Sequence, residues 1–324
     1  MTTAADTTLQ RPGRLADYLS LARFDHVTKH VFVLPGVALA LLLRGAQNGN
    51  LPLHIVLGFI CAIAIASANY VINEWLDRDF DKHHPTKSAR AAVNVTMKVS
   101  RIYGFWALLV AIGLGAALLS SFTMFCVALV FAGQGIVYNV PPIRSKDRAF
   151  IDVLSESINN PLRLLIGWAM VDAGTLPPGS IILAYWLGGA FLMAAKRLSE
   201  YREITGTHGV DLLIRYRKSF AGYSEVSLFT STFLYALSSV AMFAVFLIKY
   251  RIEYVLLLPF LCILFAVYMA LSLPSGSVAQ APERLFSERG LMLAVAAFCL
   301  ALGVLTLVDL PGLEALSSQR FLLL

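Results

Sequence analysis

Three oxygen-bearing side chains follow one another at four-residue intervals: Asn73, Asp77 and Asp81. Because four helical residues turn the chain by about 400°, these side chains share one face if the segment is a helix. Hard oxygen ligands on a rigid element suit Mg²⁺, which usually completes its coordination with water and substrate phosphates. The spacing therefore predicts a magnesium site that binds a diphosphate and stabilises it as a leaving group. The alternative is a solvated acidic helix end balanced by Arg78 and Lys82.

A second polar run begins with Lys196 and Arg197 and continues to Glu200 and Glu203. Lys196 and Glu200 are four residues apart and share a helix face. One carboxylate there is a candidate metal ligand, while the two cations are candidates for binding phosphate oxygens directly. The alternative is an ordinary ion pair between neighbouring turns, which is worth about 0.2–0.5 kcal/mol.

Polar residues also interrupt an apolar segment at 152–171. Glu156, Asn160 and Arg163 fall on one helix face, at a depth where unpaired charge is costly. Either Glu156 pairs with Arg163, or Arg163 reaches the phosphate of a lipid acceptor. Lys29, at the start of the first apolar segment, is a second candidate for that phosphate or an anchor to lipid headgroups.

The composition of the chain places these groups in a membrane. Of the 324 residues, 58% are hydrophobic and 14% are charged, whereas soluble domains are about 45–50% apolar and about 25% charged. This composition excludes a cytosolic enzyme, a disordered regulator and a nucleic-acid-binding module. The net charge of +6 is better explained by membrane orientation and anion binding, because the Lys and Arg residues lie between apolar runs.

The apolar pattern predicts an all-α, polytopic membrane protein with about nine spans. A bilayer core needs about 20 apolar residues per helix. The predicted spans are 28–45, 52–75, 102–120, 122–139, 152–171, 179–196, 226–247, 253–273 and 290–308. They form one transmembrane catalytic domain, 28–310, between an N-terminal tail, 1–27, and a C-terminal tail, 311–324. No repeated halves are found, which disfavours a secondary transporter.

Loop charges predict the orientation. If the N-terminus is cytoplasmic, most of the 26 Lys and Arg residues are cytoplasmic, as the positive-inside rule requires. The exceptions are Arg44, Lys249, Arg251 and Arg320 on the opposite side, and Arg163 within the membrane. We therefore expect a multi-pass protein of the cell (inner) membrane whose active-site mouth faces the cytoplasm.

The motif of Asn73, Asp77 and Asp81 at the end of the second span resembles the first signature of the UbiA superfamily of intramembrane prenyltransferases. The segment from Tyr138 to Lys146 and the nine predicted helices extend this resemblance. It implies a helical bundle around a central cavity, Mg²⁺ bound by the three motif residues, and phosphate contacts from Arg144 and Lys146. Glu74 departs from the pattern, because many members have Asp there.

Members that use aromatic acceptors usually carry a second Asp-x-x-x-Asp motif, and the sequence has none after residue 140. Three patches instead resemble the decaprenyl-phosphate phosphoribosyltransferase branch: His84 to Lys87, Lys196 to Glu200, and Arg217 to Ser219. That branch implies phosphoribosyl pyrophosphate as the diphosphate donor and a polyprenyl phosphate as the lipid acceptor. Such a donor has more anionic oxygens than a prenyl diphosphate, so a site rich in Lys and Arg suits it. The candidate contacts are Lys87, Arg90, Lys196, Arg197 and Lys218.

The sequence thus predicts a Mg²⁺-dependent transferase that moves a group, best matched by phosphoribosyl, from a diphosphate to a lipid. The alternative within the same superfamily is transfer of a prenyl group from an isoprenyl diphosphate to an aromatic or other small acceptor. A transporter is the less favoured third class.

Overall fold

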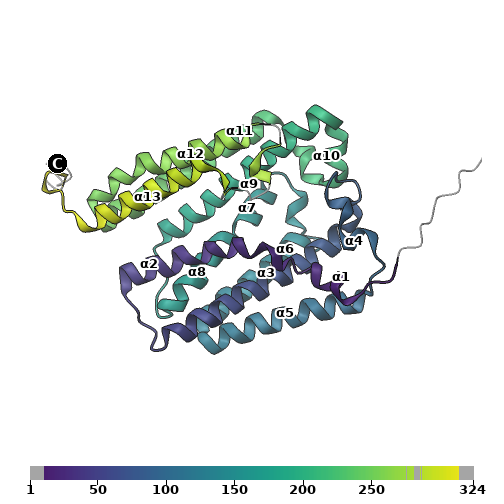
Figure 1. Cartoon of the computed structure of the whole chain (residues 1–324), viewed down its shortest axis with the longest axis horizontal. Coiled ribbons are helices and arrows are strands. Elements are labelled where there is room, and N and C mark those ends of the chain that lie inside the picture. The colour runs from purple at the N-terminus through teal and green to yellow at the C-terminus, as the bar shows by residue number, and fades with distance from the viewer. Residues whose placement is uncertain (1–10, 275, 281–284, 286, 314–324) are drawn as a thin grey trace, which may run out of the picture. The chain divides into compact units, whose positions relative to one another are not determined.

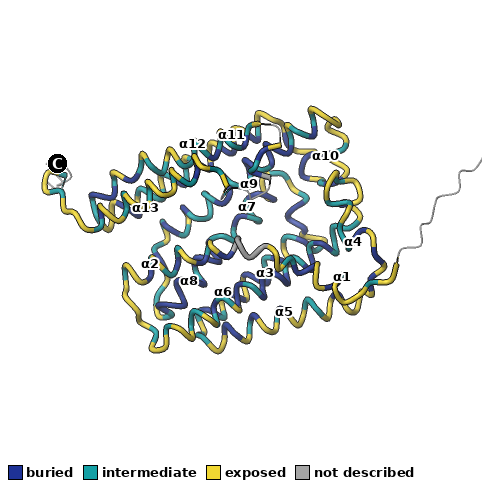
Figure 2. The backbone as a smooth tube through the Cα atoms, viewed as in Figure 1, coloured by how far each residue is buried: buried dark blue, intermediate teal, exposed yellow. Residues whose placement is uncertain are grey.

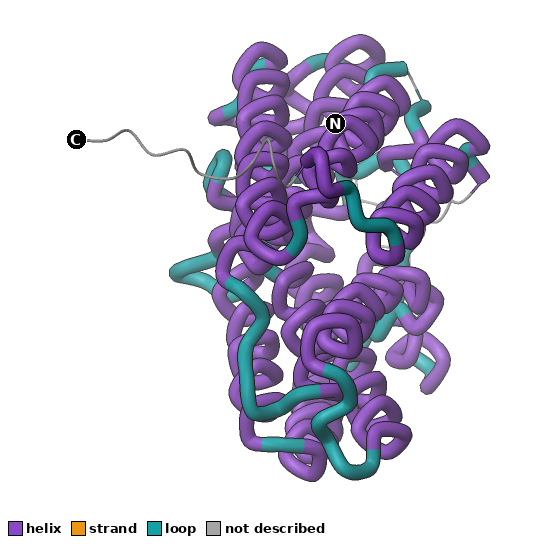
Figure 3. Tube along the Cα trace, turned by 90° about the vertical axis from the view of Figure 1, so that its left-hand side faces the viewer, coloured by secondary structure: helices purple, strands orange, loops and turns teal. Residues whose placement is uncertain are grey.

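The computed structural model describes residues 11–274, 276–280, 285 and 287–313. Parts of both predicted tails, and the side chain of Lys29, lie outside the described residues. Within the described part every regular element is helical, apart from one isolated bridge between Pro12 and Thr96 (Figure 3). The predicted all-α fold class is confirmed.

The chain divides into two compact units, which we describe separately. The first comprises Met1–Ser155, Leu162–Leu176 and Gly209–Gly222. The second comprises Glu156–Pro161, Pro177–His208 and Tyr223–Leu324. The candidate magnesium motif lies in the first unit and the Lys196 run lies in the second.

Three long helices form the body of the first unit: α3 (Leu51–Asp81), α5 (Val99–Ser120) and α6 (Phe122–Asn139). They pack against one another and run side by side in Figure 1. The first unit also contains shorter helices: α1 (Leu15–Ser20), α2 (Leu34–Arg44), α4 (Ala91–Asn94), α10 (Val210–Tyr216) and the 3-10 helices Phe24–Val33, Lys87–Ala89, Ser145–Asp147 and Lys218–Gly222.

Helix α3 carries the candidate metal motif, and its sequence explains both its start and its length. The Asn50 side chain accepts a hydrogen bond from the backbone N–H of Leu53, and Pro52 occupies the first turn, where it costs no hydrogen bond. The middle of the helix is rich in alanine, and the stretch from Cys61 to Ala68, buried except at Ile63, lets neighbouring helices approach closely. The helix stays regular to Asp81, so the motif residues lie on a rigid element.

Glycines bring α2 and α8 (Asn159–Val171) into close contact within the first unit. A Cβ on Gly36 would overlap the carbonyl oxygen of Leu164, and one on Gly167 would overlap that of Val33. Small residues at such crossings are typical of membrane helix packing. The C-terminal part of the fifth predicted span, which is α8, therefore packs closely against α2.

The second unit contains four long helices: α9 (Gly179–His208), α11 (Glu225–Tyr250), α12 (Leu258–Ser272) and α13 (Arg289–Leu307), with 3-10 turns at Ile252–Leu257 and Val278–Gln280. Helices α9 and α11 pack together over their lengths. Few residues of α12 and α13 are buried, as the teal and yellow tube in Figure 2 shows, and α13 has exposed apolar side chains such as Leu293 and Leu300. An apolar outer surface of this kind fits contact with lipid.

Seven helices of the described chain are long and apolar enough to cross a membrane: Leu51–Asp81, Val99–Ser120, Phe122–Asn139, Gly179–His208, Glu225–Tyr250, Ile252–Ser272 and Arg289–Leu307. The predicted first span corresponds to a shorter apolar helix, His30–Arg44. The predicted fifth span is divided at Ile158 into α7 (Ile151–Ser157) and α8. The multi-pass character is confirmed, and the count of nine spans and their orientation stay predictions.

Candidate active site

The first unit contains a partly open cavity at the C-terminal end of α3. It encloses about 340 Å³, its open mouth included. The lining comes from α3, from the turn that follows it, from the segment after α6 and from the α10 segment. The lining residues are Asp77, Phe80, Asp81, Lys87, Arg144, Lys146, Asp147, Tyr216, Arg217 and Lys218. Residues far apart in sequence, six of them predicted as site residues, thus lie around one space.

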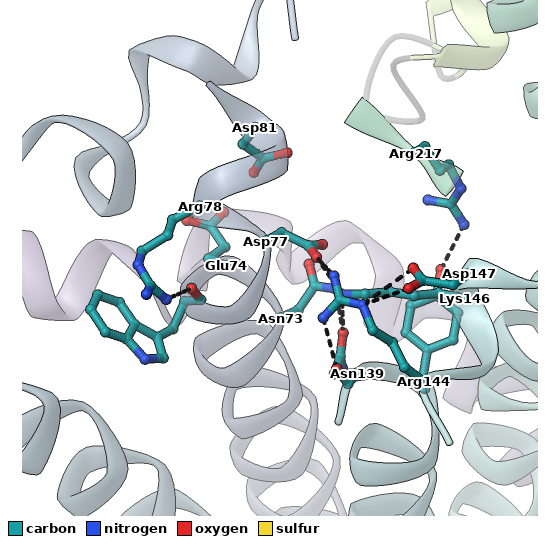
Figure 4. Close-up of polar contacts among 12 residues, drawn as sticks. Asn73, Glu74, Asp77, Arg78, Asp81, Asn139, Arg144, Lys146, Asp147 and Arg217 are labelled. Carbon is teal, nitrogen blue, oxygen red and sulfur yellow. Dashed lines mark hydrogen bonds and ion pairs between the residues drawn. The ribbon is translucent and has the colours of Figure 1, made fainter. Parts of the chain in front are cut away.

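Asp77 lies between two cations in this cavity (Figure 4). Its Oδ1 lies 2.7 Å from Nη2 of Arg144 and 2.6 Å from Nζ of Lys146. The Lys146 side chain is only 5% exposed. Burial lowers the pKa of the Lys146 ammonium to about 8, an effect that Asp77 opposes and that Arg144 adds to. The carboxylate and its two cations form a buried charge cluster with a positive excess.

Arg144 adopts an unusual backbone conformation, with φ 29° and ψ 63°, which is uncommon for a residue other than glycine. Its side chain compensates through several contacts. Nη1 donates to the carbonyl oxygen of Asn139 at 3.0 Å, and Nε donates to Asp147 at 3.2 Å. The guanidinium also lies over the Phe80 ring, 5.0 Å from its centroid. The charged group is therefore held at the cavity wall from several sides.

Asn139, at the last turn of α6, connects the candidate ligand Asn73 to the cations. Its Oδ1 accepts hydrogen bonds from Nδ2 of Asn73 at 2.6 Å and from Nζ of Lys146 at 2.8 Å. Its own Nδ2 donates to the carbonyl oxygen of Gly135 at 2.8 Å. Asn73 does not line the cavity in the described structure, and it reaches the charged residues through Asn139.

Asp81 lines the cavity and forms an ion pair with Arg90, which does not line it. Nη1 of Arg90 is 2.9 Å from Oδ2 of Asp81 and 3.5 Å from Oε1 of Glu74. Arg90, predicted to contact donor phosphates, is not among the described lining residues of this cavity. Arg90 instead pairs with two carboxylates of α3, those of Glu74 and Asp81.

Sequence reasoning missed the anchoring of the α10 segment. Nη2 of Arg217 lies 3.0 Å from Oδ2 of Asp152 and 3.0 Å from the hydroxyl of Tyr138. Asp152 is fully buried and also accepts a hydrogen bond from Ser219. The patch that begins at Arg217 was visible in the sequence, but its partner, Asp152, lies 65 residues away.

The donor set fits magnesium. Among the described residues no group of three or more His, Cys, Asp and Glu side chains is placed to hold a metal ion. Mg²⁺, however, is commonly bound through one or two carboxylates together with substrate phosphates and water. Asp77, Asp81 and Asp147 supply three carboxylates to one cavity, and its Lys and Arg side chains are the kind that bind phosphate.

The remaining predicted residues divide between the two units. Arg197 and Glu200 of α9 are buried in the second unit, where Arg197 pairs with Glu156 at 2.8 Å and with Glu200 at 3.5 Å. Lys196 lies on the same helix. In the first unit the guanidinium of Arg163 lies over the Phe131 ring, 5.2 Å from its centroid. The pairing of Glu156 with Arg197 was not anticipated from the sequence, where a pair with Arg163 was one of the two alternatives considered.

Comparison with known proteins gives a consistent result. The model of the UbiA prenyltransferase family matches residues 32–293. The chain is 26% identical to protoheme IX farnesyltransferase 2 of Bacillus subtilis, over 62% of this chain and 67% of that protein. It is 28% identical to the decaprenyl-phosphate phosphoribosyltransferase of Corynebacterium glutamicum, over 68% of this chain and 64% of that protein. The chain thus spans about two thirds of the length of these two relatives.

Solved structures share the fold. A UbiA homologue from Archaeoglobus fulgidus, bound to GPP and Mg²⁺, superposes with a TM-score of 0.66 at 21% identity. The superposition covers 90% of this chain and 99% of that chain.

Proposed function

We propose, since the chain belongs to the UbiA prenyltransferase family, that the cavity at the end of α3 binds a diphosphate donor together with Mg²⁺. The group bonded to the diphosphate then moves to a lipid acceptor. The best-supported reaction is transfer of phosphoribosyl from phosphoribosyl pyrophosphate to a polyprenyl phosphate. The relative from C. glutamicum is named for this type of activity.

The positive excess of the cavity carries this proposal. Its lining has three carboxylates, those of Asp77, Asp81 and Asp147, and five cations, which are Lys87, Arg144, Lys146, Arg217 and Lys218. Phosphoribosyl pyrophosphate presents a 5-phosphate in addition to its diphosphate, so it offers more anionic oxygens than a prenyl diphosphate. Arg and Lys bind such oxygens through charge-assisted hydrogen bonds.

The residues of the cavity have separate roles in this reaction. Arg144 and Lys146 bind diphosphate oxygens and stabilise the negative charge that develops on the leaving group. Asp77 and Asp81, with Asn73 as the predicted third ligand, would hold Mg²⁺, which supplies charge neutralisation at the diphosphate when bound. Lys87 and Lys218, which line the same cavity, would bind the additional phosphate.

Transfer exchanges one carbon–oxygen bond for another. The bond between the anomeric carbon and the diphosphate oxygen breaks, and pyrophosphate leaves with the electron pair. A phosphate oxygen of the acceptor forms the new bond to the anomeric carbon. A general base is not required, because a phosphate monoester is already anionic near pH 7.

The predicted residues outside this cavity keep proposed roles. Lys196, Arg197 and Glu200 are proposed to contact the donor, and Glu200 is the candidate for a second metal. Arg163 and Lys29 are proposed to contact the acceptor.

Prenyl transfer from an isoprenyl diphosphate to a small acceptor is the second candidate. The relative from B. subtilis is named a farnesyltransferase, and the A. fulgidus structure contains GPP. Such a donor has one diphosphate and a long apolar chain. It would engage fewer of the five cationic side chains of the cavity than phosphoribosyl pyrophosphate would.

One experiment separates the two reactions. The purified full chain is given labelled phosphoribosyl pyrophosphate with polyprenyl phosphate, and separately labelled isoprenyl diphosphate with an aromatic acid. Each arm is run with and without a chelator of divalent cations. We expect labelled lipid only in the first arm, and only without chelator. Product in the second arm alone would replace the proposed donor.

The first prediction concerns Asp77. Asp77→Ala removes a proposed metal ligand and should lower turnover about 100-fold or more, while the protein still inserts into the membrane. Asp79→Asn is the matched control, because Asp79 is on the same helix, has a 60% exposed side chain and pairs with Lys82. The measurement is turnover under saturating Mg²⁺. Wild-type activity in Asp77→Ala would refute the metal role.

A further inference from the structure

His84 lies in the turn that follows α3, three residues after the candidate ligand Asp81. Backbone hydrogen bonds connect this turn to the end of the helix. The N–H of His84 donates to the carbonyl oxygen of Asp81 at 3.1 Å, and the N–H of Ser88 donates to that of His84 at 3.3 Å. The same turn supplies Lys87 to the lining of the cavity. The mechanism proposed above gives His84 no role.

The imidazole ring of His84 fixes the backbone of this turn. Its Nδ1 accepts hydrogen bonds from the backbone N–H of Thr86 at 3.2 Å and from that of Lys87 at 3.3 Å. A ring nitrogen that accepts hydrogen bonds carries no hydrogen of its own, so these contacts assign the ring hydrogen of the neutral form to Nε2. The His84 side chain therefore holds the backbone from which the Lys87 ammonium extends.

The ring of His84 also contacts a second segment of the cavity wall. Tyr216, the last residue of α10, lines the cavity and is buried. Its ring meets that of His84 edge to face, with 4.6 Å between the centroids and 60° between the planes, an arrangement that aromatic rings favour. Tyr216 directly precedes Arg217 and Lys218, which line the same cavity.

One side chain thus contacts both the turn that carries Lys87 and the segment that carries Lys218. A lysine has a flexible four-carbon stem, so the place of its ammonium depends on how firmly its backbone is held. Groups that are held in place before the ligand arrives lose less conformational entropy on binding. Arg144 and Lys146, in contrast, are held by contacts with Asn139 and Asp77 on α6 and α3.

We propose that His84 is a positioning residue for the 5-phosphate of the donor, because it holds Lys87 and the α10 segment where Lys87 and Lys218 can bind that group. The inference rests on the proposed function, since it divides the donor site of that reaction into two parts. Arg144 and Lys146 serve the diphosphate, which both candidate donors have. The part that His84 fixes serves the phosphate that only phosphoribosyl pyrophosphate has, so His84 determines donor specificity.

The first test compares KM with kcat for the full chain in nanodiscs. His84→Phe keeps an aromatic ring next to Tyr216 but removes the acceptor for Thr86 and Lys87. We expect the KM for phosphoribosyl pyrophosphate to rise about tenfold or more, the effect of a misplaced charged hydrogen bond. The kcat at saturating donor and the inhibition constant of pyrophosphate should stay within about twofold of wild type.

A conservative variant and a double variant separate positioning from a folding defect. His84→Asn places an amide oxygen near the position of Nδ1 and should recover most of the loss in KM. Lys87→Gln should raise the KM for the donor by itself, and His84→Phe should add little to it, because residues that act through one another are not additive. If the two effects multiply, His84 acts independently of Lys87 and the assignment fails.

His83→Phe is the matched control for His84→Phe. His83 is the preceding histidine of the same turn, and its side chain is exposed. The substitution introduces the same residue type next to the cavity turn without removing the Nδ1 acceptor of His84. We expect the KM for the donor and the inhibition constant of pyrophosphate to be those of the wild type. A rise in KM equal to that of His84→Phe would overturn the assignment.

Melting temperatures measured without acceptor separate this proposal from the proposed function. In the presence of Mg²⁺, phosphoribosyl pyrophosphate should raise the melting temperature of the wild type more than an equal concentration of pyrophosphate does. His84→Phe should lose this difference. Equal shifts in the wild type would refute the donor of the proposed function and the subsite with it. A difference that persists in full in His84→Phe would leave that donor in place and overturn the positioning role.

Discussion

Asn139 shows how a neutral side chain sets the geometry of the charged ones around it. Its exposed fraction is 2%, and its amide bonds Asn73, Lys146 and Gly135 at once. Nδ2 of Asn73 donates its hydrogen bond to Asn139. The amide oxygen of Asn73, the atom that would bind a metal, is not used in that bond. Asn139 is therefore a positioning residue for a proposed metal ligand and for a phosphate-binding cation.

Substitution of Asn139 tests this role. Asn139→Ala removes the acceptor shared by Asn73 and Lys146 and should lower kcat about 10–100-fold, as losses of outer partners of metal ligands do. It should also raise the Mg²⁺ concentration needed for half-maximal activity. The measurement is activity as a function of Mg²⁺.

Val137, two residues before Asn139, provides a control. Val137→Ala changes an exposed side chain of the same helix and should leave the Mg²⁺ dependence unchanged. An Asn139→Ala enzyme with lower kcat but unaltered Mg²⁺ dependence would indicate a purely structural role.

At the residue scale the sequence predicted much of the cavity. Asp77 and Asp81 were predicted from spacing, and Arg144 and Lys146 from resemblance. Arg217 was not selected, nor was Asn139 given a role, because their functions come from contacts with residues more than 60 positions away. Spacing along one helix predicts a shared face, whereas the partner across the interface depends on tertiary packing.

At the scale of elements, the crossing of α2 and α8 depends on two glycines. The atoms nearest to the missing side chains are backbone carbonyl groups, which cannot rotate away as a flexible side chain can. A side chain added at this point would therefore push the two helices apart, which destabilises the packing. Arg163, on α8, depends on this crossing for its place in the first unit.

Gly36→Ala should destabilise the protein by about 1–3 kcal/mol or more, the usual range for overpacking. Gly104→Ala, on α5, is the control, because a Cβ there meets no atom within 4 Å. That substitution should be neutral or slightly stabilising. The measurement is the melting temperature of both variants in the same detergent. Equal melting temperatures would show that the crossing tolerates side chains.

The predicted spans correctly located most of the long helices, but they did not predict where those helices end. The second and sixth spans were predicted to end at 75 and 196, but α3 continues to Asp81 and α9 to His208. Apolar runs indicate only the part of a helix that suits lipid, and both helices continue with polar residues beyond it. The fifth span, with its polar residues, is interrupted at Ile158, where periodicity alone predicted a continuous helix.

At the scale of the whole molecule, the distribution of Lys and Arg determines the expected orientation. The segments 76–101 and 140–151 are rich in these residues, and both contribute to the cavity. The positive-inside rule therefore predicts that the cavity, and the donor site proposed for it, face the cytoplasm. Polar loops of the opposite side carry few cations.

Cysteine labelling tests this orientation. In a chain whose four native cysteines are replaced by alanine, His83→Cys should react with a membrane-impermeant maleimide only after the cytoplasmic side is opened. Ala46→Cys should react in intact cells. Both positions are exposed in the structure. The reverse pattern would put the cavity on the outer side and remove it from a cytoplasmic donor.

The close pairing of Asp77 with Arg144 and Lys146 has a consequence for how Mg²⁺ and the donor bind. A carboxylate already neutralised by two cations has little affinity for a bare divalent ion, so cellular Mg²⁺ alone competes poorly for it. A diphosphate donor that bound Arg144 and Lys146 would compete with Asp77 for these cations and so make the carboxylate available to Mg²⁺. Mg²⁺ and the proposed diphosphate donor should then bind as a single complex, and each alone should bind weakly.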